Sequence, residues 1–408
     1  MATSPRRTRR PTLLAALVLA LTAPLALAAC DVGDVTEAVS GDEPAGQESG
    51  SAKPDDPVAV SLNVKRGAKQ VPVDTRLTVR AEHGTLGKVV VSAAEGKLRG
   101  TLSKDRTTWT AASLLEPGTA YQVRAAAKGM EGGTAASNLR FRTADLSLDE
   151  QTFPSVAPLD GETVGVGMPV VVSFDVPVKD KAAFEKRMTV TSKPAQKGAW
   201  HWLSDTEAHW RPQTYWKPGT QVDVDVAVNS VPAGGGVYGQ EDRRISFTVG
   251  DSHVYKVDAA AHTMKVFDNG RLVRTFKVTT GKEGFTTRSG IKVIMEKHES
   301  KRMRSETIGI GEGDSEYYDL DNVQWAMRLT HSGEFIHAAP WSTGSQGLAN
   351  VSHGCTGMST ADAKWLYDHS RRGDVVEYVG TDRQMTLENG YGDWNLPFQQ
   401  YAQGSALS

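Results

Sequence analysis

The chain has little cysteine, no excess of charge of either sign and no apolar run of ample length for a membrane span. Its 408 residues include only two cysteines, Cys30 and Cys355, which excludes a disulfide scaffold. The 46 Lys and Arg against 48 Asp and Glu leave a formal charge of −2, whereas a nucleic-acid-binding protein would show a basic excess. No nucleic-acid partner is therefore expected. At roughly 150 residues per domain, the length predicts two or three domains.

Residues 1–29 have the layout of a signal peptide. Four arginines between positions 6 and 10 precede a stretch, 13–29, that is apolar except for one threonine. This stretch is slightly short for a spanning helix. It closes as Leu27-Ala28-Ala29-Cys30, which resembles the lipobox of bacterial lipoproteins, where the cysteine is acylated and begins the mature chain. Cys30 is therefore predicted to be the lipidation site, and an ordinary cleavage site with a chance cysteine is the alternative.

Residues 30–57 are predicted to form a flexible acidic tether. From position 31 onward the segment carries eight carboxylates and one base, Lys53, with no aromatic residue. Such a segment cannot bury enough apolar surface to offset the entropy of ordering it. Fully extended, it would reach at most about 95 Å, at ~3.5 Å per residue.

Two copies of one β-rich module are predicted next, at 58–145 and 146–250. Trp109 precedes a Pro-Gly-Thr turn by eight residues, and Trp210 precedes a second such turn by the same eight. Each turn leads into a strand with alternating apolar residues. Short strands repeated at this spacing predict immunoglobulin-like β-sandwiches.

Four tryptophans, Trp200, Trp202, Trp210 and Trp216, crowd the second module. Exposed on the surface, they would stack on sugar rings; buried, they would fill the sandwich core and a domain interface. The strand position of Trp200 and Trp202, which flank one residue on the same face, favours packing. Neither module shows clustered nucleophiles, bases or metal ligands, so we interpret both as spacers.

The residues from 251 to 380 predict a third, mostly β domain with few helices. Two apolar runs, 254–267 and 272–278, are joined by Asp268-Asn269-Gly270, a strong hairpin signal. Further strands are expected at 291–295 and 374–379. One helix is expected, with Ser359 as its N-cap and its end near Gly373. Residues 381–408 are expected to pack on this domain as a C-terminal extension.

Cys355 lies in a turn, Ser352-His353-Gly354-Cys355, just before the expected helix. In an exported protein a lone cysteine is either a buried apolar residue or a reactive thiol. The polar His353 and the flexible Gly354 beside Cys355 favour a reactive thiol. A free thiol of pKa ~8.5 is only about 3% thiolate at pH 7, so a nucleophile needs a base. His337, after the apolar strand, is the candidate base. A zinc site of His337, His353 and Cys355 is an alternative that lacks an apparent fourth ligand, and no metal is predicted.

The order His337, fourteen residues, then Ser352-His353-Gly354-Cys355 resembles the active-site signature of the L,D-transpeptidases (YkuD-type). The resemblance covers nearly the whole chain, from the lipobox, the acidic tether and the two immunoglobulin-like modules to the catalytic domain and a tail with Gly392-Asp393-Trp394-Asn395. This arrangement is similar to that of the actinobacterial, mycobacterial-type members. The fold that it implies is mostly β, with two immunoglobulin-like β-sandwiches followed by a YkuD-like, β-rich catalytic domain.

The resemblance also implies roles for individual residues. Cys355 would be the nucleophile and His337 its base, while His353 and Gly354 would shape the turn, with the backbone N–H groups of Gly354 and Cys355 as oxyanion donors. Four further residues would contact substrate: Tyr318 (with Tyr317 as the alternative), Ser352, Ala338 and Gly357. The last two depart from the family, which commonly has Ser after the base His and Asn two residues after the Cys. Fewer side-chain contacts to substrate are therefore expected at these two positions.

The reaction that the resemblance implies is acyl transfer on peptidoglycan stem peptides. A Cys355 thioester would form with release of D-Ala from a tetrapeptide donor, and an acceptor stem would resolve it into a 3→3 crosslink, without a cofactor. Carbapenem β-lactams would be inhibitors, and a lipid anchor would hold the enzyme on the outer face of the cytoplasmic membrane. The alternatives are an L,D-carboxypeptidase with the same nucleophile and a non-catalytic wall-binding lipoprotein in which Cys355 is inert.

Overall fold

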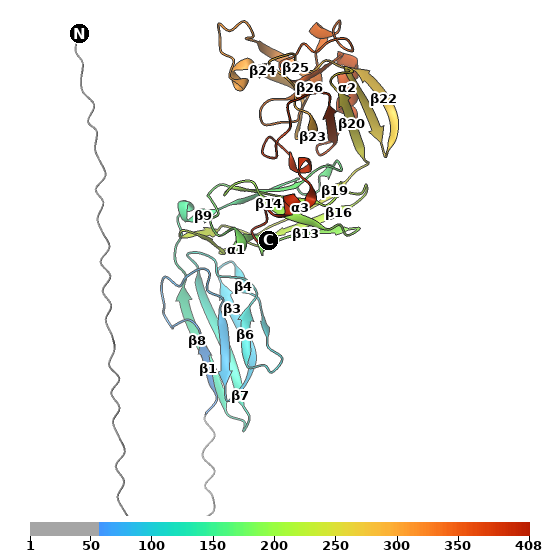
Figure 1. Ribbon diagram of the computed structural model, residues 1–408. Helices are drawn as coiled ribbons and strands as arrows, with labels where there is room; N and C mark the ends of the chain where they lie inside the picture. Colours follow the sequence, from blue (N-terminus) through green and yellow to red (C-terminus); the bar gives the residue numbers. More distant parts are fainter. Residues whose placement is uncertain (1–56) are drawn as a thin grey trace, which may run out of the picture. The chain divides into compact units, whose positions relative to one another are not determined.

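The computed structural model describes residues 57–408, so the predicted signal peptide, Cys30 and the tether up to residue 56 lie outside the described residues (Figure 1). The described part is mostly β, as predicted, and its strands form seven sheets. Its α-helices are α1 (Lys181–Glu185), α2 (Thr360–His369) and α3 (Phe398–Ala402), and its 3₁₀ turns are η1 (Leu148–Glu150), η2 (Ser305–Ile308), η3 (Pro340–Ser342) and η4 (Asp393–Asn395). None of these helices has the length and apolar character that crossing a membrane requires.

The first module is a sandwich of two four-stranded sheets, β1-β2-β6-β5 and β4-β3-β7-β8. Its core contains buried residues from both sheets, among them Trp109, Tyr121 and Phe141. The strands are β1 (Ala59–Leu62), β2 (Thr78–Glu82), β3 (Gly84–Ala93), β4 (Gly96–Leu98), β5 (Gly100–Leu102), β6 (Thr108–Ala111), β7 (Ala120–Gly129) and β8 (Thr134–Arg142). The alternation seen in the sequence thus places one face of each sheet in the core.

The second module packs the sheet β10-β12-β15-β14 against the sheet β11-β19-β16-β13, with a small sheet β17-β18-β9 beside them. The strands are β9 (Gln151–Thr152), β10 (Pro154–Ala157), β11 (Thr163–Val164), β12 (Val170–Phe174), β13 (Met188–Lys193), β14 (Gly198–Trp202), β15 (Glu207–Pro212), β16 (Gln221–Val226), β17 (Pro232–Gly234), β18 (Val237–Gly239) and β19 (Arg243–Val249). All four tryptophans noted in the sequence are at least 92% buried in its core. Packing was therefore the right prediction, and stacking on sugar rings was wrong.

The repeat that relates the two modules has a packing basis. In each module a glycine on the neighbouring strand lies directly under the repeated tryptophan. A Cβ at Gly100 would lie 2.3 Å from the ring of Trp109, and a Cβ at Gly198 would lie 2.2 Å from the ring of Trp210. No side chain fits at those distances, so each indole requires a glycine across the ladder.

The third group of strands forms a five-stranded sheet, β22-β21-β20-β28-β23, and a four-stranded sheet, β24-β25-β26-β27. Apolar side chains of both sheets and of α2 share one core. The strands of the first sheet are β20 (His253–Asp258), β21 (Thr263–Asp268), β22 (Arg271–Lys277), β23 (Gly290–Val293) and β28 (Val375–Val379). Those of the second sheet are β24 (Glu296–Arg304), β25 (Asp319–Arg328), β26 (Phe335–Ala338) and β27 (Thr356–Met358).

The predicted hairpin and helix are present, with corrected bounds. Asp268 pairs with Arg271, and the two residues between them have positive φ, 46° at Asn269 and 82° at Gly270, as a type I′ turn requires. The run 254–267 is not one strand, because a turn separates β20 from β21. In this turn Asp258 Oδ1 accepts hydrogen bonds from the N–H groups of Ala260 and Ala261. Helix α2 begins after Ser359, which accepts from the Asp362 N–H, but it ends four residues before Gly373.

The C-terminal extension packs on the second module as well as on the catalytic domain, so the prediction of its place was incomplete. Asn395 Oδ1 accepts from the Ile291 N–H at 2.8 Å in the catalytic domain. In the second module, the Trp394 indole donates to Gly167 O at 2.8 Å, and Asp393 bonds His209 Nδ1 at 3.0 Å. Buried His209 of β15 has Glu207 of its own module beside Nε2, and the extension supplies Asp393 for Nδ1.

Candidate active site

The parallel pairing of β26 with β27 brings the predicted base close to the predicted nucleophile. His337 lies opposite Gly357, and Cys355 is the residue just before β27. Because side chains alternate along a strand, Cys355 lies on the same face as His337 and diagonal to it. Both line a cavity of about 350 Å³ together with Ser352, His353 and Tyr318.

The thiol and the imidazole are both neutral in this environment. Cys355 keeps part of its surface open to the cavity, yet the surrounding protein desolvates the sulfur and raises the pKa of the thiol to about 12. Burial lowers the pKa of His337, so its ring is uncharged near pH 7. The His337 Nδ1–H donates to Ala338 O at 2.8 Å, which leaves the Nε2 lone pair free to accept a proton.

The turn before Cys355 is held by hydrogen bonds of its own. Ser352 Oγ donates to Cys355 O at 2.6 Å and accepts from the Gly354 N–H at 3.1 Å, while Thr287 Oγ1 donates to Gly354 O at 2.8 Å. Gly354 has a φ of 119°, which favours glycine. The Gly354 N–H, which was expected to be an oxyanion donor, is thus bonded to Ser352 Oγ in this structure. Cys355 N–H has no hydrogen-bond partner among residues 57–408 and is the donor that remains.

His353 and Tyr318 form another part of the lining of this cavity. His353 Nε2 lies 2.7 Å from Glu316 Oε2, which also accepts from Lys282 at 2.6 Å, and the rings of His353 and Tyr318 are 5.1 Å apart. Tyr318 lines the cavity, whereas the alternative, Tyr317, does not. Burial raises the pKa of Tyr318 to about 12, so its phenol remains protonated.

Ala338 and Gly357 were also predicted to bind substrate. They line neither this cavity nor a second, larger one that also reaches Cys355. Ala338 is 2% exposed and belongs to the hydrophobic core, because it points to the opposite side of β26 from His337. A Cβ at Gly357 would lie 3.0 Å from both Ala339 Cβ and Thr279 Cγ2. A side chain at this position would therefore press on Ala339 and Thr279.

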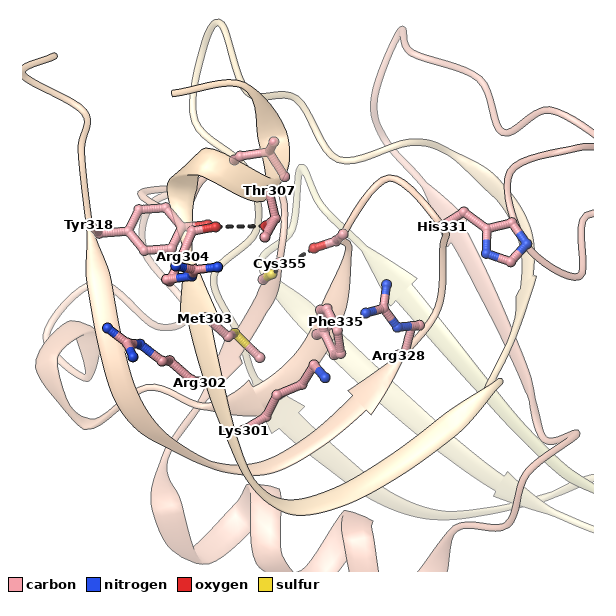
Figure 2. A pocket seen from close by; sticks show the side chains of 12 residues that line it. Lys301, Arg302, Met303, Arg304, Thr307, Tyr318, Arg328, His331, Phe335 and Cys355 are labelled. Carbon is pink, nitrogen blue, oxygen red and sulfur yellow. Dashed lines mark hydrogen bonds between the residues drawn. The ribbon is translucent and has the colours of Figure 1, made fainter. Parts of the chain in front are cut away.

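A second cavity, of about 490 Å³, is also lined by Cys355 (Figure 2). Met303, Tyr318 and Cys355 line both cavities. The second one has a basic wall made of Lys301, Arg302, Arg304, Arg328 and His331. In the sequence this wall is marked by the basic run Lys301 to Arg304. It was not predicted as part of the site because strand β24 was not predicted.

A buried ion-pair network lies behind the nucleophile and was also missed. Glu334 accepts from Lys292 Nζ at 2.5 Å and from Arg288 Nη1 at 2.9 Å, and Lys292 is fully buried. Burial lowers the pKa of Lys292 to about 8. The charge of Lys292 lowers the pKa of the Cys355 thiol, and that of Glu334 raises it.

Comparison with known proteins shows the family of this chain. A model of the L,D-transpeptidase catalytic domain matches residues 252–377, and one of a bacterial Ig domain matches residues 68–232. The chain is 38% identical to L,D-transpeptidase 2 of Mycobacterium tuberculosis (strain CDC 1551 / Oshkosh) over 349 residues, which cover 85% of each chain. This chain belongs to the L,D-transpeptidase family.

Other relatives of this L,D-transpeptidase extend the comparison. It is 33% identical to L,D-transpeptidase 5 of M. tuberculosis (strain ATCC 25618 / H37Rv), over 83% of this chain and 75% of the relative. A solved structure of the L,D-transpeptidase LdtMt1 in complex with imipenem is 37% identical and covers 55% of this chain and 97% of that one, with a TM-score of 0.49. The identity to L,D-transpeptidase 2 confirms the family resemblance that the motif around Cys355 indicated.

Proposed function

We propose that this L,D-transpeptidase joins peptidoglycan stem peptides by 3→3 crosslinks through a thioester on Cys355. The observation that carries the proposal is that Cys355 and His337 line one cavity, with the imidazole oriented so that Nε2 is unprotonated. The thiol donates to Gly333 O at 3.5 Å in this structure and has to turn toward Nε2 to react. A neutral imidazole beside a thiol is the arrangement that nucleophilic cysteine catalysis needs.

In the first half-reaction, His337 Nε2 takes the thiol proton as the sulfur attacks the carbonyl that precedes the terminal D-Ala of a tetrapeptide stem. The carbonyl oxygen becomes an oxyanion near the Cys355 N–H, a contact worth about 3 kcal/mol in comparable sites. The C–N bond then breaks, the proton passes from His337 to the leaving amine, and D-Ala departs. The donor stem remains as a thioester.

In the second half-reaction, an amine of the acceptor stem loses a proton to His337 and attacks the thioester. The C–S bond breaks, and the sulfur regains its proton from His337. Because the thiol pKa is about 12, a preformed thiolate is rare at neutral pH and proton transfer has to accompany attack. General-base assistance of this kind contributes about 10²- to 10⁴-fold.

The two cavities suggest separate approaches for the two stems. The basic wall around Lys301 and Arg304 suits a donor that bears carboxylates, including that of the departing D-Ala. The leaving amine of the donor and the amine of the acceptor both have to reach His337, which lines the smaller cavity, so the charge of the wall alone distinguishes the two approaches. We therefore assign the larger cavity to the donor and the smaller cavity to the acceptor.

The test uses purified donor and acceptor stems and, separately, imipenem, which the related LdtMt1 structure holds. Intact-protein mass spectrometry should find one acyl adduct on Cys355, and it should be absent in Cys355→Ala. His337→Ala should acylate at least 100-fold more slowly at pH 7 and recover partly at higher pH. His298→Ala, at a partly exposed histidine paired with Glu296, is the matched control.

The products of the stem reaction separate the alternatives. Crosslinked dimers support the proposal, while tripeptide alone would identify an L,D-carboxypeptidase. An adduct on another residue, or full acylation of the His337 variant at pH 7, would overturn the assignment of the nucleophile and base.

We further propose that the mature enzyme begins at a diacylated Cys30 and is anchored to the outer face of the cytoplasmic membrane. The support is Leu27-Ala28-Ala29-Cys30 after an apolar stretch. Two acyl chains give stable anchoring, whereas one gives marginal binding. Cys30→Ala should release the processed protein from membranes, and equal membrane association of that variant would overturn the proposal.

A further inference from the structure

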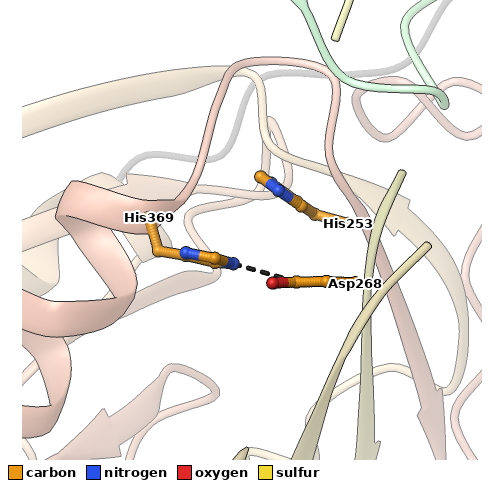
Figure 3. Close-up of side chains that lie close together, drawn as sticks. All are labelled: His253, Asp268 and His369. Carbon is orange, nitrogen blue, oxygen red and sulfur yellow. Dashed lines mark hydrogen bonds and ion pairs between the residues drawn. The ribbon is translucent and has the colours of Figure 1, made fainter. Parts of the chain in front are cut away.

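Two imidazole–carboxylate pairs of the catalytic domain have similar geometry but different locations. His353 Nε2 lies 2.7 Å from Glu316 Oε2, and His369 Nε2 lies 2.9 Å from Asp268 Oδ1 at the end of α2 (Figure 3). The four side chains are between 22% and 33% exposed. His353 lines a cavity at the nucleophile, whereas no residue drawn in Figure 3 does. Of the two pairs, the one with Glu316 is therefore placed to affect the reaction.

One oxygen of Glu316 joins three segments of the chain around the nucleophile. Oε2 accepts from Lys282 Nζ at 2.6 Å and from His353 Nε2 at 2.7 Å. The Lys282 N–H in turn donates to Ser352 O at 2.9 Å, in the catalytic turn, residues 352–355. The hydrogen bonds from Lys282 and His353 lower the pKa of Glu316, so the carboxylate is ionised. An ionised carboxylate only accepts, so Nε2 of His353 carries its proton.

Glu316 belongs to the loop 309–318, here called the Tyr318 loop, which has few other attachments. Three of its ten residues are glycine, and Ile310 is its only buried residue. Within residues 57–408, the hydrogen bonds of this loop other than those of the Glu316 carboxylate stay inside the loop or go to η2 at its start. Glu316 therefore makes the polar contacts that hold the loop against the rest of the domain.

The Tyr318 loop ends in a residue that lines both cavities at the nucleophile. Tyr318 contributes to the larger and to the smaller cavity, and its ring lies 5.1 Å from that of His353. His353 itself precedes Cys355 by two residues in the catalytic turn. Loss of the Glu316 carboxylate would therefore loosen two parts of the lining at once, Tyr318 through its loop and His353 through its ring.

We propose that Glu316 is a positioning residue for the acyl transfer, and that its carboxylate latches the Tyr318 loop to the catalytic turn. This inference rests on the proposed role of Cys355 as the nucleophile. The latch touches no reacting atom, and it acts by holding Tyr318 and His353 in place around a bound stem. Misplacement by about 1 Å can slow a reaction about 100-fold. A smaller effect, of about tenfold, is expected for a loop that stays attached at both ends.

The test compares Glu316→Ala with Asp268→Ala, which removes the same kind of partner from His369. In Glu316→Ala, acylation of Cys355 by imipenem at pH 7 should be about tenfold slower than in the parent. Alkylation by iodoacetamide should instead be at least about threefold faster, because an open loop admits water and a small reagent to the thiol. Amide exchange over residues 309–318 should be at least about tenfold faster. Asp268→Ala should change none of the three rates.

Two further variants test whether the charge acts through the proposed contacts. Glu316→Gln can still accept from the His353 N–H, so its effects should lie between those of the parent and of Glu316→Ala. Lys282→Met should change the rates in the same directions, and adding it to Glu316→Ala should have no further effect, since Lys282 acts through the carboxylate. The unfolding temperature of Glu316→Ala should stay within about 2 °C of the parent, because a partly exposed ion pair adds little stability.

Slower reaction with both reagents, equal effects of Glu316→Ala and Asp268→Ala, or unchanged exchange of the Tyr318 loop would each overturn the proposal. Exchange and alkylation involve no stem peptide, so they test the latch even if crosslinking is absent. Failure of the proposed function would be seen in the parent itself, as missing crosslinks or an adduct outside Cys355.

Discussion

The imidazole of His337 is oriented by the carbonyl oxygen of Ala338, the residue that follows it in the chain. The Nδ1 to O distance is 2.8 Å. Because the acceptor belongs to the main chain, the side chain at 338 is free to vary without loss of the contact. An alanine where family members commonly have serine is therefore compatible with a correctly held base.

Ala338→Ser should accordingly leave the acylation rate within about threefold of the parent. A hydroxyl in that buried position is expected to lower the free energy of unfolding by about 1–3 kcal/mol unless it finds a partner. The rate of imipenem adduct formation by mass spectrometry and the unfolding temperature check the two effects separately. A hundredfold slower acylation would show that the side chain, and not the carbonyl, orients the ring.

Gly357→Asn should destabilise the catalytic domain and leave the Michaelis constant for the donor little changed. The new Cβ would lie 3.0 Å from Ala339 Cβ and Thr279 Cγ2, and overpacking of this kind costs about 1–3 kcal/mol. Thermal unfolding measures the loss, and Ala339→Gly in the same chain should recover part of it. A selective change in the Michaelis constant with unchanged stability would place the side chain in the substrate site instead.

Opposite shifts in thiol reactivity are expected from the two members of the buried pair Lys292–Glu334. Loss of the positive charge in Lys292→Met raises the thiol pKa, and loss of the negative charge in Glu334→Gln lowers it. The pH dependence of alkylation by iodoacetamide should move up in the first variant and down in the second. A purely structural pair would shift neither midpoint, although each variant should lose stability, because breaking a buried pair costs about 3–5 kcal/mol.

The contact of His209 with Asp393 makes stability depend on pH on the alkaline side. Burial alone would lower the pKa of His209, but Asp393 and Glu207 outweigh it and raise the pKa to about 9. When the pKa of a histidine is higher in the folded than in the unfolded state, its protonation stabilises the fold. This stabilisation is complete below the pKa of the unfolded state, near 6.5, and it is lost as the pH rises through the folded-state pKa of about 9. The unfolding temperature should fall over that interval, and in His209→Gln this fall should be absent.

Local patterns in the sequence were sufficient for much of this structure. The turn Asn269-Gly270, the N-cap Ser359 and the alternating strands depend on neighbours in the chain, so they could be predicted. The pair Cys355 and His337 was found because a motif places them, although only the β26–β27 register explains why they meet. Of the basic wall, only the run Lys301 to Arg304 is visible in the sequence. The Glu334 network joins residues from separate segments of the chain, and no short-range pattern encodes such proximity.

The desolvated thiol of Cys355 has a further consequence, for its oxidative lifetime. With a pKa of about 12, roughly one sulfur in 100,000 is ionised at pH 7, against about 3% of an ordinary thiol. Peroxide attacks the thiolate, so conversion of Cys355 to sulfenic acid should be slower than that of an ordinary thiol. We therefore expect the nucleophile to resist oxidation until a substrate and His337 together draw its proton away.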